Sequence, residues 1–145
     1  MIVSHLRRRE MQMVPGVIEN LLPDFALGDI LRMSAEEHCA RVLGQICQSA
    51  LKYAEHANAL LTNYNQLPEA CLKLIPNHFK ADYDFEDIKK MRAAARFNAK
   101  TPQISFVSDV RSKNEEASDA VRMAAAEYVD PCYRKLEEIR LKAND

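Results

Sequence analysis

Glycine is scarce in this chain, with three residues among 145, at positions 16, 28 and 44. None of them falls in an expected turn from a strand into a helix, where a phosphate-binding loop requires glycine. The sequence also lacks a G-x-S-x-G elbow and an H-E-x-x-H pair. These absences exclude a P-loop, a hydrolase-type serine elbow and a zincin-type metal site from the residues given.

Paired cysteine motifs are also missing. The four cysteines stand at positions 39, 47, 71 and 132, and none forms a C-x-x-C pair. Cys39 and Cys47 fall on one apolar helix face, so we interpret them as reduced, buried thiols rather than as zinc ligands or a disulfide framework. The four histidines are scattered. His78 follows an expected helix, which favours a helix-end or packing role over that of a catalytic base.

The chain has almost no net charge, because 20 Lys and Arg are set against 21 Asp and Glu. No apolar run approaches the ~20 residues that a membrane-spanning helix needs. At the N-terminus, basic residues follow a short apolar start, the reverse of the order in a secretory signal. We therefore expect a cytoplasmic protein with neither a nucleic-acid nor a membrane partner.

One short apolar segment, Ala59–Tyr64, is expected to form a strand buried on both faces of a parallel sheet. Such a strand needs neighbours for its backbone groups, and the chain offers at most one other weak strand, Ile104–Val107. The expected fold class is mainly α with one or two short strands. The sequence then predicts a single incomplete domain that forms part of a larger α/β fold.

Helical patterns fill most of the remaining chain. Ser34 and Glu37 form a capping box ahead of an apolar stripe, on a helix that is expected to end near Glu55 to Asn58. Asp84 is expected to cap a helix over residues 85–97, and Ser108 or Asp109 a long final helix that Pro131 kinks or restarts. Two further elements complete the prediction: a helix that begins at Pro68, and a long loop over residues 11–33 with a short helix near 27–31.

A cluster of basic residues near the N-terminus allows two interpretations. Arg7, Arg8 and Arg9 are consistent with a solvated end of a helix, where cations are favoured. They are also suited to an anion site, because arginine matches phosphate oxygens in a bidentate way, although composition alone favours the solvated helix end. Ser4 adds a hydroxyl donor about one turn before Arg7 and Arg8.

Lys100, Asp109 and Lys113 form a second, looser group. A solvated i, i+4 ion pair explains Asp109 and Lys113 without any function. Lys100 lies in a proline-containing loop and has no comparable structural explanation. Lys100 is therefore the better candidate for a ligand contact.

Taken in order, several segments resemble the C-terminal half of bacterial sulfotransferase-family proteins that use 3′-phosphoadenosine 5′-phosphosulfate. The resemblance spans about residues 2 to 140. It rests on the segments Ile2–Arg9, Met13–Ile18, Glu36–Cys47, Asn63–Pro68 and Ala94–Pro102, and on the pattern Phe106-x-x-Asp109-x-x-x-Lys113.

The resemblance implies a three-layer, P-loop-like α/β fold in which an N-terminal loop grips the phosphosulfate. A later serine and arginine hold the 3′-phosphate. Ser4 matches that serine by position, whereas the arginine and the phosphosulfate loop would precede Met1. Arg7 and Arg8 lie beside Ser4, and Lys100 and Lys113 are substitutes for the family's later basic loop, which is not recognisable here. These five residues are the implied cofactor-binding set, and no catalytic or metal-binding residue is assigned.

The implied parent activity is transfer of a sulfuryl group to an unknown acceptor. Half of the implied site is missing, so we expect the isolated chain to be inactive. The alternative is a non-catalytic helical module that self-associates or binds a partner through the exposed edge of the Ala59–Tyr64 strand.

Overall fold

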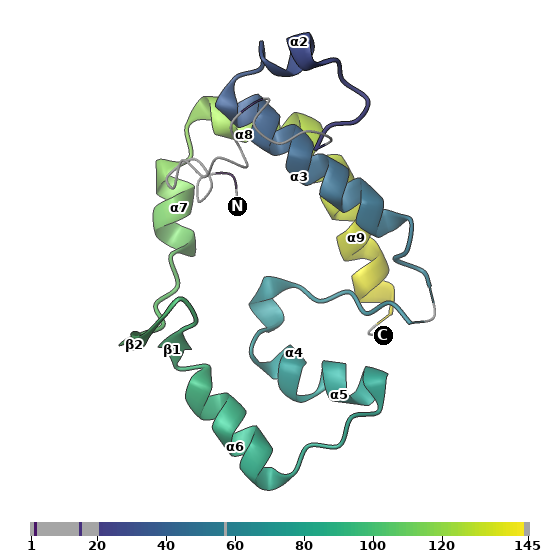
Figure 1. The fold of residues 1–145 in the computed structure, drawn as a ribbon. Coiled ribbons are helices and arrows are strands. Elements are labelled where there is room, and N and C mark those ends of the chain that lie inside the picture. Colours follow the sequence, from purple (N-terminus) through teal and green to yellow (C-terminus); the bar gives the residue numbers. More distant parts are fainter. Residues whose placement is uncertain (1, 3–14, 16–20, 57, 144–145) are drawn as a thin grey trace. The chain divides into compact units, whose positions relative to one another are not determined.

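The computed structural model describes residues 2, 15, 21–56 and 58–143. Across these residues the fold is mainly helical, with one two-stranded antiparallel sheet (Figure 1). The chain divides into two compact units. The terminal unit comprises residues 1–55 and 110–145, and the middle unit comprises residues 56–109.

The main helix of the terminal unit is α3, Ala35–Leu51. Its N-cap is Ser34, whose hydroxyl oxygen accepts a hydrogen bond from the Glu37 amide at 3.1 Å, so the predicted start is confirmed. The helix ends at Leu51, one to two turns before the expected end near residues 55–58. The short helix predicted in the preceding loop is also present, as α2, Leu27–Ile30.

Three helices form the C-terminal part of the terminal unit: α7, Val110–Glu116; α8, Asp119–Tyr128; and α9, Asp130–Lys142. The predicted restart is confirmed, because Pro131 lies in the first turn of α9, where a missing amide costs nothing. A second break separates α7 from α8. Ser118 causes it by capping α8, with its hydroxyl oxygen accepting from the Val121 amide at 3.3 Å.

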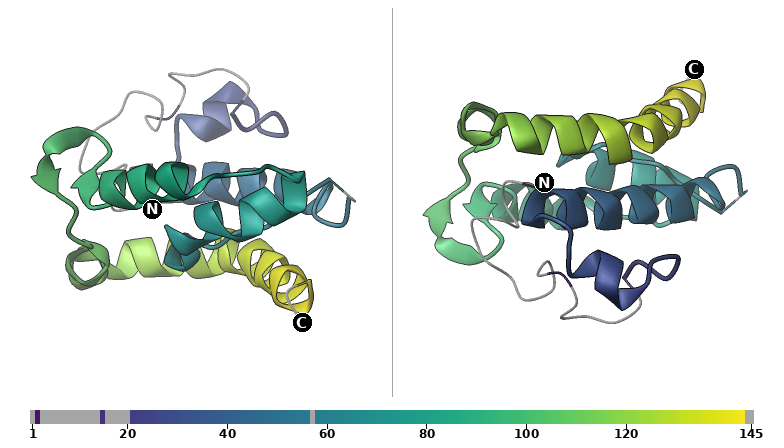
Figure 2. Two further views of the ribbon diagram at one scale, coloured as in Figure 1. Left: turned by 90° about the horizontal axis from the view of Figure 1, so that it is seen from below. Right: turned by 90° about the horizontal axis from the view of Figure 1, so that it is seen from above.

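Helix α3 runs beside α8 and α9 in the same direction (Figure 2). The closest approach is at Gly44. A Cβ atom at this position would overlap the carbonyl oxygen of Tyr128 and lie 3.1 Å from its carbonyl carbon. The absence of a side chain at residue 44 therefore lets the two helix backbones meet.

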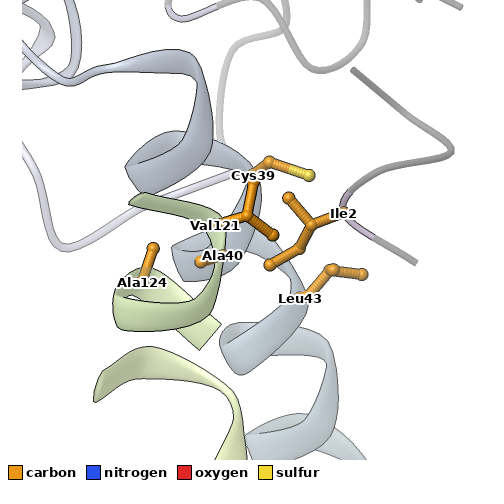
Figure 3. Packing of buried hydrophobic residues seen from close by; sticks show 6 residues of the cluster. All are labelled: Ile2, Cys39, Ala40, Leu43, Val121 and Ala124. Atoms are coloured by element: carbon orange, nitrogen blue, oxygen red, sulfur yellow. The ribbon is translucent and has the colours of Figure 1, made fainter. Parts of the chain in front are cut away.

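The core of the terminal unit is small. It joins three residues of α3 to Val121 and Ala124 of α8, whose side chains point toward one another (Figure 3). The cluster consists of Ile2, Cys39, Ala40, Leu43, Val121 and Ala124. Half of these side chains are small, namely those of Cys39, Ala40 and Ala124.

The middle unit contains a 3₁₀ turn, three short helices and the sheet. The elements are η2, Tyr64–Gln66; α4, Glu69–Leu72; α5, Leu74–Phe79; α6, Phe85–Ala94; β1, Phe97–Asn98; and β2, Thr101–Ser105. The predicted cap of α6 is confirmed, because a carboxylate oxygen of Asp84 accepts from the Asp87 amide at 2.8 Å. The helix that was expected to begin at Pro68 is divided into α4 and α5 at Lys73.

The predicted strand Ala59–Tyr64 is wrong. Residues 59–63 have no regular structure, and Tyr64 begins η2. The Asn63 side chain accepts from the Asn65 amide at 2.9 Å, and the Gln66 side chain accepts from the Asn63 amide at 2.8 Å. These local hydrogen bonds satisfy backbone groups that a buried strand would have left for neighbouring strands.

The weaker strand candidate, Ile104–Val107, is correct only in part. Ile104 and Ser105 lie in β2, whereas Phe106 and Val107 lie beyond its end. Strand β2 pairs antiparallel with β1, with Phe97 opposite Ser105. The described residues therefore contain a β-hairpin and no parallel strand pair, so the inference of a parallel sheet fails for this part of the chain.

Candidate functional site

The terminal unit contains an open, apolar cavity of about 440 Å³. Helix α3 supplies one wall through Leu43, Ile46 and Cys47, and α8 and α9 supply the opposite wall. The full lining is Ile2, Leu43, Ile46, Cys47, Lys113, Asn114, Ala117, Val121, Arg122, Ala125, Val129, Asp130 and Tyr133. A mainly apolar concavity with a few polar groups is the usual form of a small-molecule site.

The charged groups of this cavity are Lys113, Arg122 and Asp130. A guanidinium nitrogen of Arg122 donates to the Asn114 carbonyl oxygen at 2.6 Å, which links α8 to α7. The Asp130 carboxylate lies 3.6 Å from a guanidinium nitrogen of Arg134. Lys113 and Arg122 bring two positive charges to the lining and Asp130 brings one negative charge, so the cavity is suited to a ligand that combines an apolar body with an anionic group.

Cys47 is the one thiol in the lining of this cavity. Burial raises the pKa of the Cys47 thiol, and the nearby Cys132 raises it further. The thiolate is the reactive form of cysteine, so a raised pKa argues against Cys47 as a nucleophile. No group of His, Cys, Asp and Glu side chains within the described residues is arranged to hold a metal ion.

On another side of α3, Arg41 is held by three neighbours. Its Nε donates to a Glu37 carboxylate oxygen at 2.8 Å, and a terminal guanidinium nitrogen donates to the Tyr128 hydroxyl oxygen at 3.0 Å. The guanidinium carbon also lies 4.0 Å from the ring centroid of Tyr128 and 4.9 Å from that of Phe25. Arg41 thus ties the segment before α2 to α3 and α8, which is a structural role.

Three of the five sequence-predicted site residues, Ser4, Arg7 and Arg8, lie outside the described residues. Lys100 is exposed in the turn between β1 and β2, where its amide donates to the Asn98 side chain at 2.9 Å. Lys113 lies in α7 and lines the apolar cavity. Lys100 belongs to the middle unit and Lys113 to the terminal unit, so neither unit by itself brings the two together.

Sequence reasoning missed Arg122 and Tyr133 as residues of this cavity. The available signal was the apolar stripe of Val121, Ala125 and Val129, with a basic residue beside it. Residues 110–130 were expected to form one uninterrupted helix. After the break at Ser118, α7 contributes Lys113 and Asn114 to the lining of the cavity.

Comparison with protein-family models, curated proteins and solved structures finds no match to this chain. None of these comparisons therefore supports the sulfotransferase resemblance that the sequence suggested. Across the residues that the structure describes, no helix combines the length and the apolar character needed to cross a bilayer.

Proposed function

We propose that this chain supplies the C-terminal half of a sulfotransferase domain that uses 3′-phosphoadenosine 5′-phosphosulfate. The observation that supports the proposal is that large apolar side chains of the middle unit are exposed to solvent. Phe85 is 78% exposed and Val107 is 79% exposed, and neither α6 nor β2 contains a buried residue. A half-domain that lacks its partner half leaves apolar side chains uncovered in this way, since a globular domain normally buries them.

In this proposal the partner half is an N-terminal segment that carries the phosphosulfate loop and completes a three-layer, P-loop-like α/β fold. Ser4, Arg7 and Arg8 contact the 3′-phosphate of the cofactor, and Lys100 and Lys113 supply further positive charge. The reaction breaks the bond between sulfur and the phosphate oxygen and forms a bond between sulfur and a nucleophilic atom of the acceptor, which releases its proton to solvent. Negative charge develops on the leaving phosphate, so donors aimed at it are essential.

The apolar cavity of the terminal unit fits this proposal. Its apolar walls can hold the body of a cofactor or acceptor, and Lys113 and Arg122 can hold an anionic group of the same molecule. Without the donors of the phosphosulfate loop, the isolated chain should show no measurable transfer. Loss of a single such donor already costs ~100-fold or more in rate.

The test begins with the genomic sequence upstream of the codon for Met1. A continuous reading frame with a glycine-rich loop, followed by an Arg-x-Pro turn, is the expected result. The protein expressed from that frame should bind adenosine 3′,5′-bisphosphate, measured by calorimetry. Ser4→Ala should weaken binding about tenfold, the effect of removing one hydrogen bond to a charged group.

The matched control is Ser49→Ala, an exposed position in α3. It should leave the affinity for the bisphosphate unchanged. Equal affinities for the wild type and Ser4→Ala would remove Ser4 from the site. An upstream region with no reading frame of this kind would overturn the proposed function.

The second candidate function is that of a non-catalytic helical module. The observation that favours it is strand β2, all five residues of which are exposed. An open strand edge is a template for pairing with another chain. Light scattering of the isolated chain tests this candidate: a concentration-dependent dimer supports it, and a monomer at all concentrations removes it.

A further inference from the structure

The chain's near-zero net charge conceals one strongly basic stretch. Between Asp87 and Asp109, residues 88–108 contain five Lys and Arg and no Asp or Glu. The five residues are Lys89, Lys90, Arg92, Arg96 and Lys100. All of them belong to the middle unit, in α6, in the β1–β2 hairpin or in the short link between the two. We call residues 88–108 the basic segment.

Little inside the protein neutralises this charge. Lys89 lies 3.3 Å from a Glu86 carboxylate oxygen, and Arg92 lies 3.4 Å from one of Glu69. Both ion pairs are exposed, and such pairs contribute little. Lys90, Arg96 and Lys100 form no ion pair with any described residue.

Large apolar side chains accompany these cations. Ile104 in β2 is 58% exposed, and Phe97, Phe106 and Val107 are also exposed. Beside the N-terminal end of the segment, Phe85 and Ile88 line a shallow groove on α6 together with Lys89, Arg92 and Arg96. Cations and apolar side chains thus occupy the same exposed elements.

Against the expectation of no membrane partner, which rested on net charge, we propose that the basic segment docks the protein on an anionic phospholipid surface. Anionic headgroups complement the five cations, and the exposed apolar side chains enter the boundary between headgroups and acyl chains. Clusters of four to eight Lys and Arg are the usual size of such a lipid-binding patch. This inference shares Lys100 and the exposed side chains of α6 and β2 with the proposed sulfotransferase function, but it does not require a sulfotransferase activity.

Charge and exposure favour this occupant over two others. A second copy of the chain would bring a second acid-free segment against the first, and like charges placed opposite each other are destabilising. A single-stranded nucleic acid would use the cations and the phenylalanines. It would gain little from Ile104 and Val107, whereas a lipid surface gains from every exposed apolar side chain.

The experiment measures co-sedimentation of the full chain with phosphatidylcholine vesicles, with and without phosphatidylglycerol. We expect binding only with phosphatidylglycerol, and weaker binding as salt is raised. The test variant is Lys90→Gln, Arg96→Gln and Lys100→Gln combined. It should bind about 100-fold more weakly, because each basic side chain near such a surface contributes roughly a fivefold factor.

The matched control is Lys52→Gln, Lys135→Gln and Lys142→Gln combined. It removes the same charge from exposed positions outside the basic segment and should bind as the wild type does. Circular dichroism checks that both variants keep their helix content. A second variant, Ile104→Ser with Val107→Ser, should weaken binding while leaving the preference for phosphatidylglycerol.

Four outcomes would overturn the proposal. They are no binding to either vesicle, equal binding to both, equal weakening by the two triple variants, and tighter binding to poly(U) RNA than to phosphatidylglycerol vesicles. The last outcome would reassign the basic segment to nucleic acid.

Discussion

Replacing Gly44 with alanine tests the packing of the terminal unit directly. The added Cβ would overlap the Tyr128 carbonyl oxygen and lie 3.1 Å from its carbonyl carbon, so α3 and α8 would have to separate. Overpacking of this kind typically costs ~1–3 kcal/mol. The obstacle here is backbone rather than a flexible side chain, which puts the cost near the upper value.

Two opposing terms set the expected result for Gly44→Ala. Alanine is favoured over glycine inside a helix by about 1 kcal/mol, which offsets part of the steric cost. The expected net loss in the free energy of unfolding is therefore about 2 kcal/mol. Urea unfolding followed by circular dichroism would show this loss as a lower midpoint with an unchanged slope.

Gly28→Ala is the matched control. A Cβ at residue 28 has only a guanidinium nitrogen of Arg32 within reach, at 4.0 Å, so it meets no steric obstacle. The same propensity gain should then leave the protein as stable as the wild type, or up to about 1 kcal/mol more stable. Equal effects of the two glycine replacements would refute the close approach of α3 and α8.

Two further predictions concern the cap of α6 and a buried thiol. Asp84→Ala removes the side-chain cap of α6 at a cost of about 1 kcal/mol. Amide hydrogen exchange in α6 should become roughly fivefold faster, while exchange in α3 is unchanged. The control is Asp82→Ala, which leaves the cap of α6 in place; equal acceleration by this variant would contradict the prediction. Burial raises the pKa of the Cys39 thiol from 9.0 to about 11. Between these two values only the unfolded chain loses the thiol proton. The contribution of the Cys39 thiol to the free energy of unfolding is therefore fully present below pH 9.0 and is lost as the pH rises to about 11. Urea unfolding across this range should show a smaller fall for Cys39→Ala than for the wild type, and parallel curves would disprove it.

The elements that the sequence predicted correctly are those defined by neighbouring residues. The Ser34 and Asp84 caps each depend on a hydrogen bond to the amide three residues later, and Pro131 acts on its own turn. Such signals are contained in a few consecutive residues. The Ser118 cap is a signal of the same kind and was available in the sequence, but residues 110–130 were predicted to form one uninterrupted helix.

The prediction of a strand at Ala59–Tyr64 was wrong because it rested on apolar composition alone, with no neighbouring strand identified to pair with it. A short apolar run suits a buried strand, a buried helix or an irregular segment, and only tertiary pairing decides between them. The polar residues Asn63 and Gln66 at the end of the run carried the decisive local information. They cap a 3₁₀ turn with their own side chains, which removes the need for a neighbouring strand.

The apolar cavity was out of reach of sequence reasoning for a different reason. Lys113 was singled out by sequence, but its neighbours in the cavity come from α3 and α8 as well as α7. Helix α3 is separated in the chain from the other two by the whole middle unit. Periodicity identifies which face of each helix is apolar, but not which faces meet.

Both proposals use the exposed side chains of α6 and β2, and they predict different behaviour for the completed protein. If an N-terminal half-domain covers α6 and β2, the completed protein should lose phosphatidylglycerol binding while it gains affinity for adenosine 3′,5′-bisphosphate. If the basic segment docks on lipid, the completed protein should keep both activities. The double variant of Lys90→Gln and Arg96→Gln should then reduce lipid binding with no change in affinity for the bisphosphate. Lys100→Gln alone therefore decides whether this lysine serves the cofactor, the membrane or both.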